Sequence, residues 1–177
     1  MIVKRDPSLF TFLRSVPVFY DLKASSMDQI LDYLEEQTWD VGEHIFNEGD
    51  SFNEGDSGRR MYILREGEVE VLRRASAGTN TSIVRLGPGE TFGEMALVEL
   101  QPRSATIIVR KKAKTYSLTN LDLFALYRTD PNAYVFILQN ICRMLSRRLR
   151  KADSRIVDFI DSQGKATSKA GKPKKKK

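Results

Sequence analysis

The chain opens with apolar residues at helical spacing. A short helix is predicted between Pro7 and Pro17, because apolar residues cluster there and proline disfavours helix continuation. A second helix follows around Ile30, and Ser25 or Ser26 is its expected cap. Two short helices are therefore expected before the pattern changes.

The end of the chain returns to helical spacing. Thr119 or Asn120 is expected to cap one helix, and Pro131 starts the next segment. The last helix is predicted from about Asn132 to Phe159, since its apolar residues recur in steps of three and four. The stripe consists of Leu138, Ile141, Leu145, Leu149, Ala152, Ile156 and Phe159.

Between residues 38 and 118 the chain instead shows short alternating runs separated by glycines. The clearest runs are 61–64, 69–72 and 83–86, and the runs 105–109 and 114–118 extend the pattern. Strands broken by glycine at such short intervals are typical of an antiparallel sandwich or barrel.

Composition limits this chain to one main domain. Its 177 residues are 41% hydrophobic, enough for one packed core. Seven lysines from Lys165 onward account for the net charge of +6, so the folded body is not basic. We expect a domain over residues 1–160 and a disordered lysine-rich tail over 161–177, which either solubilises the chain or binds nucleic acid or an anionic membrane.

The chain offers few residues for metal or redox chemistry. Its one cysteine, Cys142, is expected to be a small buried hydrophobe, and its one histidine, His44, has no companions at metal-ligand spacing. No run of 18 apolar residues and no secretory signal is present, so we expect a cytoplasmic protein.

A hexapeptide occurs twice in succession. Residues 46–51 and residues 52–57 both read Phe-Asn-Glu-Gly-Asp-Ser. A tandem copy is tolerated best in a loop between strands. The spacing of a calcium-binding loop is missing, so a turn is the simplest interpretation.

The stretch 91–97, followed by 102–106, holds the most informative side chains. Gly93 permits close backbone approach, and a helical turn after it would direct amide groups at an anion. Arg103 and Ser104 add donors for a phosphate. Glu94 would be repelled by phosphate but could accept a hydrogen bond from a sugar hydroxyl. These residues therefore suit a phosphorylated ribose, or else they are a Glu–Arg pair on a strand connection.

The same stretch resembles the phosphate-binding cassette of the cyclic-nucleotide-binding domain family, found in bacterial catabolite activator proteins and regulatory subunits of cAMP-dependent kinase. The resemblance rests on Phe92-Gly-Glu-Met-Ala-Leu97 and Pro102-Arg-Ser-Ala-Thr106, with upstream segments 54–58, 61–64 and 66–69, and covers about residues 8–160. It implies a mostly β fold with flanking helices (α+β), an eight-stranded jelly-roll barrel with N-terminal helices and a long C-terminal helix. The family needs one copy of the hexapeptide, and the second is expected to fill that place.

The resemblance also implies a set of ligand-binding residues. For the phosphate and ribose they are Phe92, Gly93, Glu94, Met95, Ala96, Arg103 and Ser104. For the base, the last helix offers Arg148, Ala152 and Asp153, with Lys151 between them. Ser104 after the arginine is more typical of members selective for cAMP than for cGMP. No cofactor is implied beyond a cyclic nucleotide ligand, most simply cAMP.

Several function classes remain to be compared. We favour a regulatory module without catalytic activity, since no nucleophile elbow, Walker loop or metal cluster is present. It would act on a separate effector protein through its last helix, alone or as a homodimer. The alternatives are a cyclic-dinucleotide sensor, a transcription regulator lacking its DNA-binding domain, and a scaffold that has lost its ligand. Too few residues follow Phe159 for a helix-turn-helix.

Overall fold

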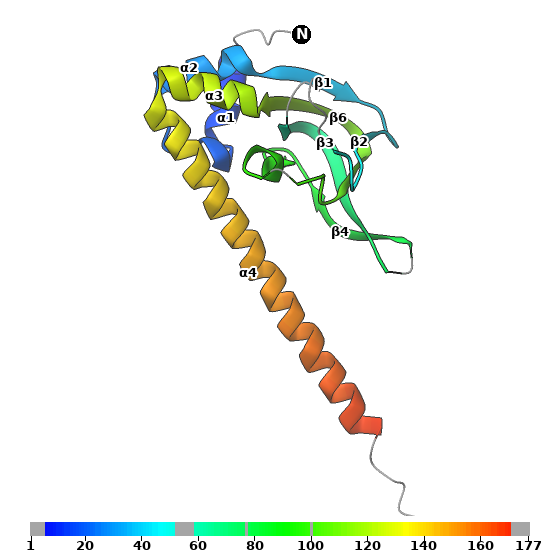
Figure 1. Ribbon diagram of the computed structural model, residues 1–177. Coiled ribbons are helices and arrows are strands. Elements are labelled where there is room, and N and C mark those ends of the chain that lie inside the picture. Colours follow the sequence, from blue (N-terminus) through cyan, green and yellow to red (C-terminus); the bar gives the residue numbers. More distant parts are fainter. Residues whose placement is uncertain (1–5, 52–58, 77, 100, 171–177) are drawn as a thin grey trace, which may run out of the picture. The chain divides into compact units, whose positions relative to one another are not determined.

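The computed structural model describes residues 6–51, 59–76, 78–99 and 101–170. It divides into two compact units, Met1–Asn140 and Ile141–Lys177, and each is described by itself. The first unit contains a β-sheet and several helices, and the second continues the last helix (Figure 1).

The N-terminal helices are α1 (Pro7–Arg14), the 3-10 turn η1 (Pro17–Phe19) and α2 (Ala24–Tyr33). The carboxylate of Asp6 caps α1 by accepting a hydrogen bond from the amide of Ser8. The predicted serine cap of α2 is wrong, because Lys23 occupies the cap position without a side-chain bond. Ser26 is buried instead and donates its hydroxyl to Asp130 at 2.6 Å.

Helices α3 (Asn120–Thr129) and α4 (Pro131–Ala170) follow the sheet. The expected cap at Thr119 is confirmed: its hydroxyl accepts from the amide of Asp122, whose carboxylate accepts from the Thr119 amide. Helix α4 continues past Phe159, so residues 161–170 of the predicted tail are helical, and 171–177 lie outside the described residues. The division at residue 160 stays a prediction.

The sheet is antiparallel throughout. Its strands are β1 (Glu35–Trp39), β2 (His44–Phe46), β3 (Arg60–Arg74), β4 (Asn80–Leu86), β5 (Thr91–Phe92) and β6 (Thr106–Thr119). The order is β1-β6-β3-β4, while β2 also pairs with β6 and β5 with β3. Helices α1, α2 and α3 gather at one end of this sheet (Figure 1).

The predicted mostly β fold with flanking helices is confirmed, but the eight-stranded closed barrel is wrong. Six strands form the sheet of the described residues, and the sheet is not closed. Runs 61–64 and 69–72 belong to the single strand β3. Run 105–109, from Thr106 onward, and run 114–118 belong to the single strand β6. Glycine within a strand marked a bend here and not an end.

The bend in β3 depends on Gly67. The pairing of β3 with β6 shifts register at three places between Leu64 and Val69, as bulges do. Gly67 has a φ of 89°, and a Cβ there would lie 2.3 Å from the Lys112 carbonyl oxygen. Only glycine therefore lets the two long strands cross so closely.

The sheet contributes to a buried apolar core. Its buried residues are Tyr62, Leu64, Val69, Leu86, Phe92, Ile107, Val109 and Ala113, with Trp39, Ile45, Phe46 and Val71 packed against them. Tyr62 stacks on Phe92 with ring centroids 5.3 Å apart. Phe92 lies directly before Gly93, so its stacking on Tyr62 of β3 helps to position the cassette.

Two expectations from composition can be compared with the described residues. Cys142 is exposed, so the prediction of a buried cysteine is wrong. Consecutive helical residues point about 100° apart, and burial of Ile141 does not bury its neighbour. Within 6–51, 59–76, 78–99 and 101–170, no helix is long and apolar enough to cross a membrane.

Candidate functional site

The site begins where β5 ends. Thr91 and Phe92 pair with Ile63 and Tyr62 of β3 and are buried. Gly93 then takes a left-handed φ of 72° and starts the 3-10 turn η2 (Glu94–Leu97). A Cβ on Gly93 would lie 2.9 Å from Nη1 of Arg103 and 3.1 Å from the Arg60 carbonyl oxygen. Both the backbone conformation and the crowding require glycine here.

Arg103 is the cation of the site and is half-buried. Its Nη1 donates to the carbonyl oxygens of Arg60 at 2.9 Å and Gly93 at 3.2 Å. Its Cζ lies 4.1 Å from the centroid of the Phe46 ring, a cation–π contact. The guanidinium is therefore fixed on one face by a ring and on one edge by two main-chain oxygens.

Electrostatics at Arg103 favour a retained positive charge. Burial lowers the pKa of Arg103, whereas the nearby Tyr62, Asp50 and Glu94 side chains raise it. An arginine titrates so far above neutrality that its guanidinium stays charged. Burial also raises the pKa of the Tyr62 hydroxyl, with Arg103 acting in the opposite direction.

The other cassette residues gather around Gly93 and Arg103. The Glu94 side chain is only 2% exposed, and Ala96 is buried as well. The Ser104 hydroxyl is exposed and contacts the sulfur of Met95 at 3.6 Å. The structure thus brings together Phe92, Gly93, Glu94, Met95, Ala96, Arg103 and Ser104.

The predicted base-contacting residues belong to the second unit. Arg148, Ala152 and Asp153 are all exposed on α4. Because that unit is described by itself, their contact with a base stays a prediction.

The sequence interpretation missed the role of the first hexapeptide copy. It expected the second copy to serve the fold. In the first copy, Phe46 is the last residue of β2, and Gly49 and Asp50 contact the cassette through the main chain of Arg103. The Gly49 amide donates to the Arg103 carbonyl at 2.8 Å, and the Arg103 amide donates to the Asp50 carbonyl at 2.9 Å. The second copy, residues 52–57, lies outside the described residues, so the expectation for it stays a prediction. The signal available in the sequence was Phe46, an aromatic residue shortly before the turn at Gly49.

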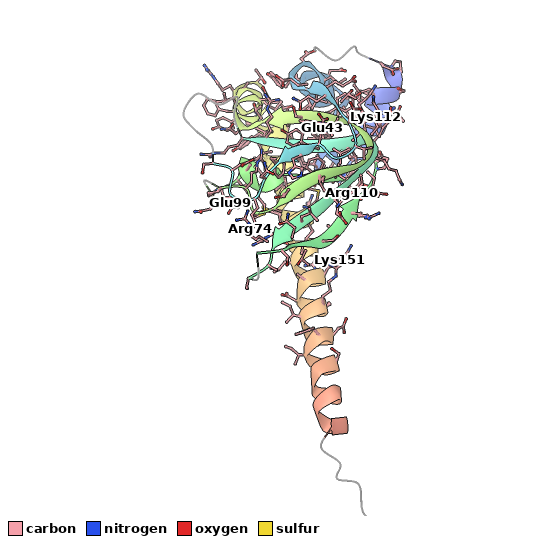
Figure 2. The ribbon with its side chains drawn as sticks, turned by 90° about the vertical axis from the view of Figure 1, so that its right-hand side faces the viewer. Glu43, Arg74, Glu99, Arg110, Lys112 and Lys151 are labelled. Carbon is pink, nitrogen blue, oxygen red and sulfur yellow. The ribbon has the colours of Figure 1, made fainter. Side chains whose placement is uncertain are left out.

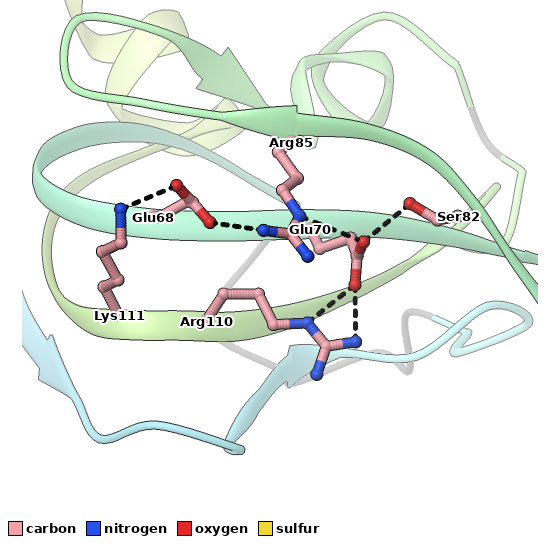
Figure 3. A network of polar contacts seen from close by, with 6 residues as sticks. All are labelled: Glu68, Glu70, Ser82, Arg85, Arg110 and Lys111. Carbon is pink, nitrogen blue, oxygen red and sulfur yellow. Dashed lines mark hydrogen bonds and ion pairs between the residues drawn. The ribbon is translucent and has the colours of Figure 1, made fainter.

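A second polar cluster lies on β3, β4 and β6 and was not predicted (Figure 3). Glu70 is 5% exposed and accepts from Ser82 at 2.7 Å, from Arg85 at 3.4 Å and from Arg110 at 2.7 Å. The hydroxyl of Ser82, then Arg110, lowers the pKa of Glu70 to about 2. Arg110, one of these donors, lies on β6 (Figure 2).

Neighbouring Glu68 completes this cluster. It pairs with Lys111 at 3.0 Å and with Arg85 at 3.2 Å. These carboxylates and cations satisfy one another across three strands, so the cluster acts as a structural brace. Among the residues described, no group of three His, Cys, Asp or Glu side chains could hold a metal ion.

Comparison with known proteins gives the site its context. The model of a family described as "Cyclic nucleotide-binding domain" matches residues 36–130. The chain is 31% identical over 141 residues to the Cyclic AMP receptor protein of Thermus thermophilus, covering 80% of this chain and 61% of that protein. It is 31% identical over 107 residues to a cAMP-dependent protein kinase regulatory subunit of Yarrowia lipolytica, covering 60% of this chain and 26% of that protein.

A solved structure agrees with these relatives. The crystal structure of the Thermus thermophilus catabolite activator protein superposes with a TM-score of 0.68 at 31% identity, covering 82% of this chain and 63% of that one. The chain thus spans about three fifths of the length of this relative. The sheet, the geometry of the cassette and these matches all agree. The chain therefore belongs to the cyclic nucleotide-binding domain family.

Proposed function

We propose that this regulatory domain binds cAMP at the cassette. The observation that carries the proposal is Arg103, a half-buried cation whose hydrogen bonds to Arg60 and Gly93 go to neutral carbonyl groups. Such bonds orient the guanidinium without cancelling its charge. The cyclic phosphate would bind to Arg103, to Ser104 and to the amide groups of residues 93–96.

Glu94 is proposed to bind the ribose. A buried carboxylate beside a phosphate is tolerated when it accepts hydrogen bonds, and the 2′-hydroxyl is the donor that the ligand offers. Arg103 also attracts the Glu94 carboxylate, because the Glu94 charge raises the pKa of Arg103. The carboxylate and the guanidinium would then bind adjacent parts of one ligand.

The base and the output are assigned to α4. Arg148, Ala152 and Asp153 are proposed to contact the base, with Lys151 beside them (Figure 2). Leu149, Ile156 and Phe159 are each more than half exposed on this helix and offer an apolar surface to an effector protein or a second copy. Ligand would act by favouring one of two arrangements of this surface.

A thermal-shift panel tests the ligand. Saturating cAMP at about 100 times its dissociation constant should add about 2.7 kcal/mol of stability. The panel includes cGMP and a cyclic dinucleotide, and cAMP should give the largest shift. A larger shift with either competitor contradicts the choice of cAMP, and no shift with any of the three contradicts nucleotide binding.

A double-mutant comparison tests Glu94. In the parent protein, 2′-deoxy-cAMP should bind more weakly than cAMP. In Glu94→Ala this difference should largely disappear. Glu99→Ala is the matched control, because Glu99 lies just after η2 and is partly exposed (Figure 2). An unchanged deoxy effect in Glu94→Ala would remove Glu94 from the ribose site.

A further inference from the structure

The ring beneath Arg103 comes from a strand distant in sequence. Phe46 is the last residue of β2, and the pairing of β2 with β6 shifts register between His44 and Phe46. A bulge of this kind lets consecutive side chains face the same side. Ile45 and Phe46 accordingly both pack against the apolar core.

Phe46 is itself held by its neighbours. Its ring lies 6.0 Å from the ring of Tyr62 and 6.2 Å from that of Phe92, measured between centroids. Its Cε1 would also lie 3.3 Å from a Cβ on Gly93, so the ring closes one side of the cassette turn. Phe46 is therefore a rigid platform rather than a mobile surface ring.

The same hexapeptide also binds the main chain of Arg103. Gly49 and Asp50 exchange two backbone hydrogen bonds with Arg103, at 2.8 Å and 2.9 Å. Asp50 is fixed in turn, since its carboxylate accepts from the Asn47 amide at 2.7 Å. Residues 46–51 thus determine both where the Arg103 backbone lies and which way its guanidinium faces.

We propose that Phe46 of the first hexapeptide copy is a positioning residue for the phosphate-binding Arg103. The inference rests on the proposed function, because it concerns the affinity for cAMP. A stacked guanidinium presents its N–H donors in the plane of the ring, so the ring limits the directions in which a phosphate can be bound. Without the ring the side chain would sample other rotamers, and ordering it would weaken binding.

The duplication supplies a matched control. Deletion of the first copy and deletion of the second copy give the same shortened sequence. Only point substitutions therefore distinguish the copies. We expect Phe46→Leu to weaken cAMP binding by about 3- to 30-fold, which spans the strengths of cation–π contacts from exposed to desolvated sites. Phe52→Leu makes the same chemical change in the same local sequence and should alter the affinity by less than about twofold.

Calorimetric titration of cAMP into the parent, Phe46→Leu, Phe46→Tyr and Phe52→Leu proteins tests this. Phe46→Tyr keeps the ring and should keep the affinity. Equal affinities in the parent and Phe46→Leu, or equal losses in the two leucine variants, would overturn the proposal. Failure of the parent to bind cAMP is a different result, which contradicts the proposed function.

A spectroscopic signature separates positioning from general stability. In the parent, the NMR signal of the Arg103 side-chain Nε–H should be shifted by the Phe46 ring current and should exchange slowly with solvent. Assignment uses the loss of that signal in Arg103→Lys. This measurement needs no folded Phe46 variant, and an Arg103 signal at the ordinary arginine position would overturn the proposal.

Discussion

Glu70 and Glu94 are both buried carboxylates in the first unit, but their surroundings differ. Glu70 is surrounded by Ser82, Arg85 and Arg110, whose charges and hydroxyl are directed at it. Glu94 lies beside Arg103, whose Nη1 donates to main-chain carbonyls. The carboxylates and cations of the first region pair with one another, whereas the Arg103 guanidinium also donates hydrogen bonds to two neutral main-chain carbonyls and stacks on a ring.

This difference indicates what each region is for. A carboxylate saturated by cations braces strands and has little capacity left for a ligand. A guanidinium oriented by a ring and carbonyl oxygens keeps its charge for an incoming anion. We therefore expect the first region to brace the strands and the second to bind the ligand.

The largest expected effect comes from removing an arginine from each region. Arg103→Ala should weaken cAMP binding by about 2–5 kcal/mol, because the phosphate loses its charge partner. Arg110→Ala should leave the affinity unchanged, since Arg110 pairs with Glu70. Calorimetric titration measures both. Similar losses in the two variants would abolish the distinction between the regions.

A second comparison uses two glycines with positive φ. Gly89→Ala should lose about 1–2 kcal/mol of stability in urea unfolding, because its position is left-handed, and Gly93→Ala should lose at least as much, because its position is left-handed and crowded. Only Gly93→Ala should also weaken cAMP binding, by about tenfold or more, since its Cβ would meet Arg103. Gly89 has open space around it. An equal effect of both variants on affinity would contradict this role of Gly93.

The stability that the Glu70 cluster contributes should depend on pH in acid. The pKa of Glu70 is lowered from 4.5 to about 2, so its stabilising contribution is present above pH 4.5 and is lost as the pH falls toward 2. Glu70→Gln should be less stable at neutral pH and lose less stability between pH 4.5 and 2. Urea unfolding across this range measures the difference. Parallel curves for parent and variant would remove Glu70 from the acid response.

The smallest expected effect is that of one hydroxyl. The Ser82 hydroxyl makes the largest contribution to the low pKa of Glu70. Ser82→Ala should therefore raise that pKa part of the way toward 4.5. A carbon-13 NMR titration of the Glu70 carboxyl group measures this. Affinity for cAMP should not change. An unshifted titration would mean that Arg110 and Arg85 determine the pKa without the hydroxyl.

Local sequence was sufficient for much of the site. The order glycine, acidic residue and small residues, followed by arginine and serine, predicted the group that the structure assembles around Gly93. It also predicted the cap at Thr119, because a capping box involves residues three positions apart. These features depend on neighbours along the chain, and neighbours are what a sequence pattern contains.

Contacts between distant strands were decided only by the tertiary structure. Phe46 reaches Arg103 because a register shift in β2 turns its side chain toward the core, and Glu70 meets Arg110 because β3 pairs with β6. Gly67, taken from sequence as the break between two strands, is the bend of one. Register and crossing angle depend on the packing of the whole sheet, so one glycine or one phenylalanine in the sequence cannot reveal which partner it will meet.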